Sequence, residues 1–145
     1  MLDRIVGYRI NRATYWANLI GIVAIVGILV TFGIVGEQGG TGAIEVVLAI
    51  LAGTRLHDMG YSAKYALAGV LLHAILSFTV LAKFGYEEAL TPLGLLNLAF
   101  LVLLVWMGLV PGQSGENRWG EQPPAGVSWK RPERRFSEDP GSVEF

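Results

Sequence analysis

The sequence contains no cysteine, and this absence removes several kinds of chemistry. Without a thiol the chain cannot form a disulfide, hold a metal through sulfur or use a cysteine nucleophile. Its two histidines are widely separated along the chain and are not accompanied by a cluster of carboxylates, so the usual ligand pattern of a zinc site is missing. We therefore expect neither a metal nor a cofactor.

Charge is also scarce. Charged residues make up 16% of the chain, against roughly a quarter in soluble domains, and a net charge of −1 gives no general attraction to nucleic acid. In contrast, 52% of the residues are hydrophobic and the mean hydropathy is +0.49. This composition predicts a protein whose main solvent is lipid.

Four apolar stretches predict an all-α integral membrane bundle of four transmembrane helices joined by short turns. A helix needs about 20 apolar residues to cross ~30 Å of hydrocarbon, and the stretches cover about residues 15–35, 43–56, 65–82 and 92–110. The second stretch is short, so Glu45 and Arg55 would have to reach opposite interfaces. Thr91 and Pro92 are expected to begin the last helix. We divide the chain into a membrane domain, 1–120, and a cytoplasmic tail rich in proline and charge, 121–145.

The charges are distributed unequally between the two faces of such a bundle. If all four helices cross, one face receives a single lysine, Lys83, and the other receives ten basic residues: Arg4, Arg9, Arg12, Arg55, Lys64, Arg118, Lys130, Arg131, Arg134 and Arg135. Basic residues are enriched on the cytoplasmic side of membrane proteins. The distribution predicts that both termini are cytoplasmic.

Three polar motifs also return to one face, because two crossings separate each motif from the next. They are Arg9-Ile-Asn-Arg12-x-x-Tyr15-Trp16, then Arg55-Leu-His-Asp-x-Gly-x-Ser62, then Pro111-Gly-x-x-Gly-x-Asn-x-Trp-Gly120. Side chains that are distant in sequence can therefore meet at the cytoplasmic end of the bundle.

The combination of these motifs, in this order, resembles the small bacterial inner-membrane proteins known as domain of unknown function 805. The resemblance covers about residues 7 to 123 and implies a small helical protein of the bacterial inner membrane, with no established activity. The chain departs from the family pattern at three places. Tyr8 stands where glycine is usual, Thr54 where a second arginine is common, and Ala63-Lys64 where Gly-Trp is usual.

The residues of the three motifs admit two interpretations. In the first they are structural: Gly60 caps a helix end, and Ser62 or Asp58 caps the next helix. Spacings of three and four also place Arg9, Arg12 and Trp16 on one helical face, where they would anchor the protein at the lipid headgroups. In the second they form a pocket for an anionic headgroup, because guanidinium groups bind phosphate or carboxylate in a bidentate manner. The candidate anion-binding or lipid-binding residues are Arg9, Arg12, Trp16, Arg55, His57, Asp58 and Asn117.

Catalysis has less support from these motifs. His57 and Asp58 are adjacent, so in a helix they diverge by about 100° and do not form a base and its orienting partner. No catalytic residue is assigned, and the pattern favours a protein that is not an enzyme.

A second group of polar residues lies inside the apolar stretches. It comprises Glu45, His73, Ser77 and Asn97. An ionisable residue at membrane depth indicates a functional site, but a neutral His73 bonded to Asn97 would also serve to hold helices together. Glu45 and His73 are expected to lie about two helical turns apart, too far for a proton relay.

Taken together, the sequence predicts a non-enzymatic membrane protein, with the bacterial inner membrane as its location. Its expected partners are anionic lipid headgroups and either a protein partner or a second copy, and not nucleic acid. The alternative is a small oligomeric transporter or channel that uses the polar face of the third apolar stretch. The stretch from Trp129 to Phe136 is interpreted as a disordered linker or as a surface segment for anionic lipids.

Overall fold

The computed structural model describes residues 7–34 and 41–129, and within these ranges the chain is all helical, without a strand. Three helices follow one another: α2, Arg12–Thr31; α3, Thr41–Asp58; and α4, Lys64–Leu109. The predicted helical class is confirmed. Val35 and most of the predicted turn, residues 36–40, lie outside the described residues, whereas the last two residues of that turn, Thr41 and Gly42, belong to α3.

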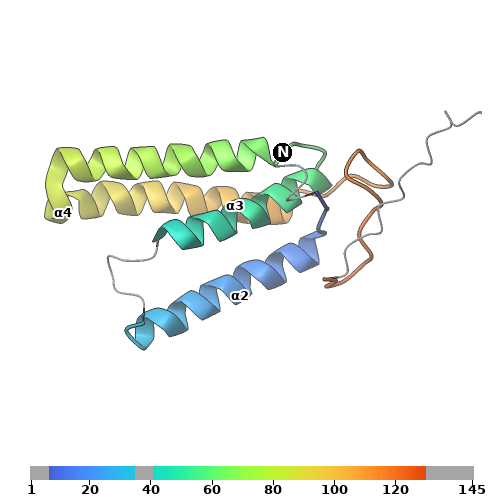
Figure 1. Cartoon of the computed structure of the whole chain (residues 1–145), viewed down its shortest axis with the longest axis horizontal. Helices are drawn as coiled ribbons and strands as arrows, with labels where there is room; N and C mark the ends of the chain where they lie inside the picture. The colour runs from blue at the N-terminus through green and yellow to red at the C-terminus, as the bar shows by residue number, and fades with distance from the viewer. Residues whose placement is uncertain (1–6, 35–40, 130–145) are drawn as a thin grey trace, which may run out of the picture.

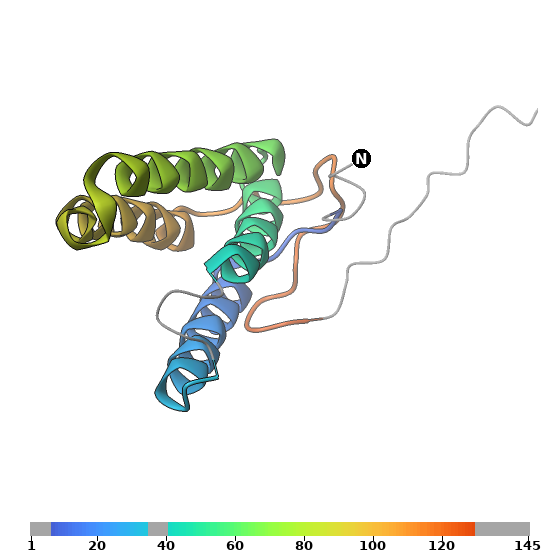
Figure 2. The same ribbon diagram turned by 60° about the vertical axis from the view of Figure 1, so that its left-hand side comes forward.

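Helix α4 is not straight. Gly85 adopts φ +71°, ψ 177°, which interrupts the helical backbone, and only glycine enters this region without steric cost. The chain therefore turns back on itself, and the two arms of α4 run side by side in opposite directions (Figures 1 and 2). The arms contain the stretches predicted as the third and fourth spans.

The prediction that Thr91 and Pro92 begin the last helix is wrong. Both residues lie inside α4, whose second arm starts directly after Gly85. Residues 83–91 look polar enough for a loop, but only one of them has a non-helical backbone. A single glycine with positive φ makes the reversal, so no longer loop is needed.

Helices α2 and α4 are long and apolar enough to cross a membrane, and their apolar windows are only 17% and 11% buried within the protein. The core helix of a soluble protein would bury most of such a window. Isoleucine and valine side chains instead face outward along α2, and mainly leucine and phenylalanine side chains along α4. These are two candidate membrane-spanning helices where the sequence predicted four separate ones.

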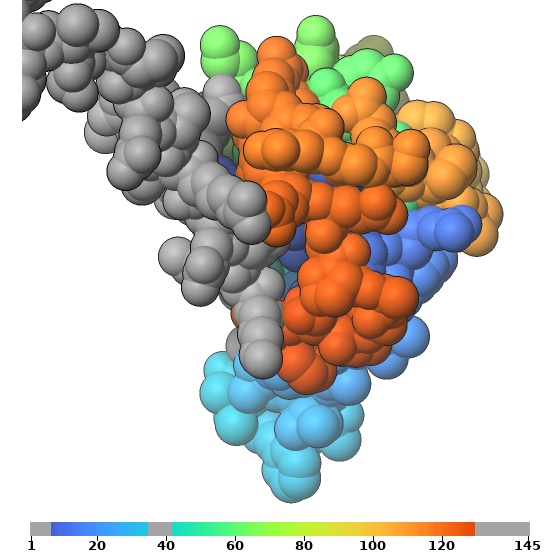
Figure 3. Space-filling model, turned by 90° about the vertical axis from the view of Figure 1, so that its right-hand side faces the viewer, coloured from blue at the N-terminus to red at the C-terminus, as the bar shows by residue number. Residues whose placement is uncertain are grey.

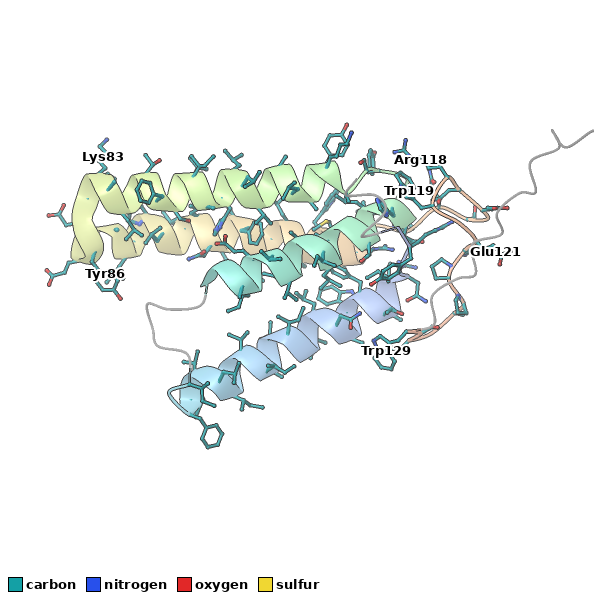
Figure 4. All side chains as sticks on the ribbon, in the orientation of Figure 1. Lys83, Tyr86, Arg118, Trp119, Glu121 and Trp129 are labelled. Atoms are coloured by element: carbon teal, nitrogen blue, oxygen red, sulfur yellow. The ribbon has the colours of Figure 1, made fainter. Side chains whose placement is uncertain are left out.

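The buried part of the protein lies at one end. All residues from Leu51 to Met59 are buried, in the second half of α3, and they pack against the start of α2 and the end of α4. The segment after α4 lies across this end of the molecule (Figure 3). Lys83 and Tyr86 mark the opposite end, at the reversal of α4 (Figure 4).

Candidate functional site

Helix α3 ends in a way that fixes its last polar residues. The Gly60 backbone has φ +88°, the Tyr61 N–H donates to the Leu56 carbonyl at 2.8 Å, and the Gly60 N–H donates to the His57 carbonyl at 3.2 Å. This is the paired bonding of a Schellman cap, so the predicted capping role of Gly60 is confirmed. The cap holds the end of α3, including Asp58, against the N-terminal segment.

The N-terminal segment enters the site as extended chain. The Asn11 side chain accepts a hydrogen bond from the Thr14 N–H at 2.8 Å and so caps the start of α2. Arg9 therefore lies before the helix, and the prediction that it shares a helical face with Arg12 and Trp16 is wrong. Residue 9 is 1% exposed and does not face the lipid headgroups.

Arg9 forms a buried ion pair with Asp58. Its Nε and Nη2 donate to Asp58 Oδ1 at 3.1 and 2.9 Å, and its remaining N–H groups donate to the carbonyls of Gln113, Gly115 and Gly120 at 2.6, 2.6 and 3.2 Å. A guanidinium has five N–H donors, and all five of Arg9 are engaged. The first and third motifs are thus joined through one side chain.

Arg55 approaches the same carboxylate from the other side. Its Nη1 donates to Asp58 Oδ2 and, at 3.3 Å, to the Ile10 carbonyl; its Nε donates to the Met107 carbonyl at 3.0 Å and its Nη2 to the Val110 carbonyl. The Arg55 side chain is fully buried. We call Arg9, Arg55 and Asp58 the arginine clasp; two arginines and one aspartate give it a formal charge of +1.

The turn after α4 completes this end of the protein. The Gln113 N–H donates to the Asp58 carbonyl at 2.7 Å, and Asn117 Nδ2 donates to the His57 carbonyl at 2.9 Å. The Trp119 ring stacks on His57 with centroids 4.5 Å apart. The Arg118 guanidinium lies over the Trp119 ring, with Cζ 3.8 Å from the ring centroid. The predicted meeting of the three motifs is therefore confirmed.

His57 is held in one tautomer by its neighbours. The Ala63 backbone N–H donates to Nε2 at 3.2 Å, so Nε2 is the unprotonated nitrogen and Nδ1 carries the hydrogen. Nδ1 lies 3.4 Å from the Tyr8 carbonyl, which accepts it. Both ring nitrogens of His57 therefore bond to the backbone. The Asp58 carboxylate bonds to the two arginines and not to the His57 ring.

Two of the seven candidate residues lie apart from this cluster. Arg12 is exposed at the first turn of α2. Trp16 packs on α4, where its Nε1 donates to the Gly108 carbonyl at 3.1 Å. A Cβ at position 108 would lie 2.5 Å from the Trp16 ring, so Gly108 allows the close approach of α2 and α4. The other five candidates are brought together: Arg9, Arg55, His57, Asp58 and Asn117.

The polar residues of the apolar stretches also form a cluster. His73 Nε2 lies 3.1 Å from Asn97 Oδ1, which joins the two arms of α4, and Glu45 Oε1 of α3 lies 3.3 Å from His73 Nδ1. The predicted separation of Glu45 and His73 is wrong. Glu45 is 13 residues before the end of α3 and His73 is nine residues after the start of α4. The two positions therefore differ in depth by four residues, or about 6 Å along the helix axes, and the two side chains bridge this difference. Ser77, one turn further along α4, is half-buried.

A cavity of about 430 Å³ lies between α2, α3 and the C-terminal segment. On α2 its lining follows one stripe, with Thr14, Asn18 and Ile22 at steps of four. On α3 it runs from Thr54 back to Leu51, Ile50 and Val47. Along both helices the lining is polar near the arginine clasp and becomes apolar away from it.

Residues 123–129 close the polar end of this cavity. Asn11 Nδ2 donates to the carbonyls of Pro124 and Gly126 at 2.5 and 2.7 Å, the Ser128 N–H donates to Thr14 Oγ1 at 2.9 Å, and Trp129 Nε1 donates to Asn18 Oδ1 at 3.2 Å. The described part of the predicted tail therefore lies along the start of α2. Residues 130–145 lie outside the described residues.

Apart from Arg9, the sequence interpretation did not assign the residues of this cavity to a site. Thr14 and Asn18 are the signal that was available, since they are two polar residues four apart in an apolar run and so occupy one helical face. Trp129 gave no comparable signal, because a contact more than 100 residues away in sequence follows no local period.

Comparison with known proteins identifies one family. A family described as "Protein of unknown function (DUF805)" matches residues 6–121, which includes all three motifs, the arginine clasp and most of the cavity lining. No curated protein and no solved structure matches the chain.

Proposed function

The chain belongs to the DUF805 family, and we propose that it is a multi-pass membrane protein that binds an anionic amphiphile, such as a phospholipid, in the cavity between α2 and α3. The observation that carries this proposal is the graded lining of the cavity. Its walls offer hydroxyl, amide and indole N–H groups at one end and only aliphatic side chains at the other. An amphiphile has the same division between headgroup and chain.

The proposed membrane arrangement has α2, α3 and the two arms of α4 crossing the bilayer. Residues 64–84 and 86–109 each supply the ~20 residues that a crossing requires. The arginine clasp would then lie at the cytoplasmic interface of the bacterial inner membrane, together with both termini. In this arrangement the order of the sequence would put ten of the eleven basic residues on that side, as the positive-inside rule expects.

The charges around the polar end favour an anionic headgroup. Arg9 lines the cavity, the arginine clasp to which it belongs carries a formal charge of +1, and Arg12 is exposed nearby on α2. The guanidinium N–H groups of Arg9 are engaged by the protein's own acceptors. We therefore assign the clasp the role of an electrostatic background. Direct headgroup contacts fall to the Asn18 amide, and to Thr14 and Trp129 once a headgroup displaces their hydrogen bonds to Ser128 and Asn18.

Native mass spectrometry of the full chain, extracted from phospholipid membranes, tests this proposal. Val47→Trp fills the apolar end of the cavity and is expected to abolish lipid co-purification. Val46→Trp is the matched control, because Val46 is 59% exposed and is not part of the lining; it should keep the lipid.

Helicity measured by circular dichroism must be unchanged in both variants, and Ile50→Trp provides a second way to fill the same space. Equal lipid content in the wild type, Val47→Trp and Ile50→Trp would overturn the proposal. So would a wild-type protein that carries no lipid.

A further inference from the structure

The cluster at membrane depth contains one nitrogen that lacks a hydrogen-bond partner. His73 is 9% exposed and is contacted from two other helical segments. These are α3, through Glu45, and the second arm of α4, through Asn97 and through the Phe100 ring, whose centroid lies 4.6 Å from that of His73. Among the described residues, none forms a hydrogen bond with His73 Nδ1. Glu45 Oε1, at 3.3 Å, is the polar atom placed to do so.

The partner of the other ring nitrogen determines where the imidazole hydrogen lies. Asn97 Oδ1 can only accept a hydrogen bond, so His73 Nε2, 3.1 Å away, carries the hydrogen and donates it. In a neutral imidazole the second nitrogen then has a lone pair and no hydrogen. The lone pair of Nδ1 would face the Glu45 carboxyl group.

An ionised Glu45 and a neutral His73 cannot share this geometry favourably, because both facing atoms are acceptors. The other ionisable residues of α3 and α4 lie towards the helix ends or beside the reversal at Gly85; they are Arg55, His57, Asp58, Lys64, Tyr65, Lys83, Tyr86, Glu87 and Glu88. An isolated carboxylate at membrane depth is also costly. One additional proton resolves the conflict, either on Nδ1, giving an ion pair, or on Glu45, giving an O–H donor to Nδ1.

We infer that Glu45 and His73 form a proton-binding site that holds one shared proton between α3 and α4 at neutral pH. The ligand is a proton, taken up from water, and the site exchanges it without any change in covalent bonding. With the proton bound, α3 is attached to both arms of α4 through His73. Loss of the proton leaves two acceptors facing each other, so the contact between α3 and α4 depends on proton occupancy.

Nitrogen-15 NMR of labelled histidine in the full chain, in phospholipid nanodiscs at neutral pH, reads the His73 side of the site directly. The chain has two histidines, so the signal set that is lost in His73→Asn belongs to His73 and the remaining set to His57. Infrared difference spectra of wild type minus Glu45→Gln read the carboxyl side. We expect one of two results: a protonated Nδ1 on His73, or a protonated carboxyl band that Glu45→Gln removes.

Glu45→Gln retains a donor for Nδ1, so the variant is expected to fold with a neutral His73 whose Nδ1 is unprotonated. If it does not fold, Glu45→Ala removes the same carboxyl band without placing a new polar group against His73. Glu87→Gln, at an exposed position beside the reversal of α4, is the control and should leave both signals unchanged. An unprotonated Nδ1 together with an ionised Glu45 in the wild type would overturn the inference.

Discussion

The arginine clasp and the Glu45–His73 pair both place ionisable groups among buried residues, but they differ in how completely their polar atoms are bonded. In the clasp, each Asp58 oxygen receives an arginine donor, and Arg9 uses all of its N–H groups. In the pair, His73 Nδ1 is left without a hydrogen bond. A fully bonded cluster resists change, whereas an incompletely bonded one can take up a ligand.

This contrast separates the arginine clasp, a structural site, from the Glu45–His73 pair, the proposed proton-binding site. Buried ion pairs with complete hydrogen bonding hold a fold in one arrangement, and breaking one partner leaves an uncompensated charge. The clasp accordingly connects the N-terminal segment, α3, the end of α4 and the turn that follows it. The Glu45–His73 pair connects helices through a single contact, and its hydrogen-bonding pattern changes with one proton.

The largest effect is expected from Asp58→Asn, which removes the only carboxylate of the clasp. Two buried arginines would then face each other without a counter-charge, and breaking a buried pair in this way costs about 3–5 kcal/mol. Unfolding in mixed micelles measures the loss. Glu116→Gln is the control, since residue 116 is exposed and the change should stay within about 0.5 kcal/mol. Equal stability of Asp58→Asn and the wild type would remove the structural role of the clasp.

Gly112→Ala is expected to have an intermediate effect. A Cβ at position 112 would lie 1.9 Å from Asp58 Oδ2, so the carboxylate or the turn must move, at a cost typical of overpacking, about 1–3 kcal/mol. Gly94→Ala is the matched control, because a Cβ there meets nothing within 4 Å and alanine favours a helix. A thermal unfolding midpoint that falls equally in both variants would show that crowding at Asp58 is not the cause.

The smallest effect is expected from Asn97→Leu. This change removes the hydrogen bond between the two arms of α4, and such bonds between membrane helices are worth about 0.6 kcal/mol on average. The same unfolding assay should resolve a small loss, while Ser77→Ala leaves Asn97 in place and should have no effect. A loss as large as that of Asp58→Asn would contradict the ranking of the two clusters.

The sequence was sufficient for the features that follow from length and periodicity. Apolar stretches predicted the helical class, and the two crossings between consecutive motifs predicted that Arg9, Asp58 and Asn117 would meet. Glycine at position 60 predicted the end of α3, because a helix cap with positive φ requires little more than the residue type.

Other features were out of reach because they depend on one backbone angle or on helix packing. The reversal of α4 occurs at Gly85, although Thr91 and Pro92 gave the stronger local signal for a helix start. The prediction placed Arg9 on the first helix because Arg9, Arg12 and Trp16 are spaced by three and four residues. Such a spacing does not show at which residue the helix begins. Asn11, a favoured N-cap residue, was the signal that could have moved that boundary.

The hydrogen bonds of Arg9 also set an order for the maturation of the nascent protein. Its acceptors at Gln113, Gly115 and Gly120 follow it by 104, 106 and 111 residues, so they emerge from the ribosome on the order of 5–20 s later at ~5–20 residues per second. During this interval α2 and α3 are already synthesised while Arg9 still lacks three of its carbonyl partners. Translation of the final helix and the turn after it is therefore the event that fixes the end of the protein that contains the arginine clasp.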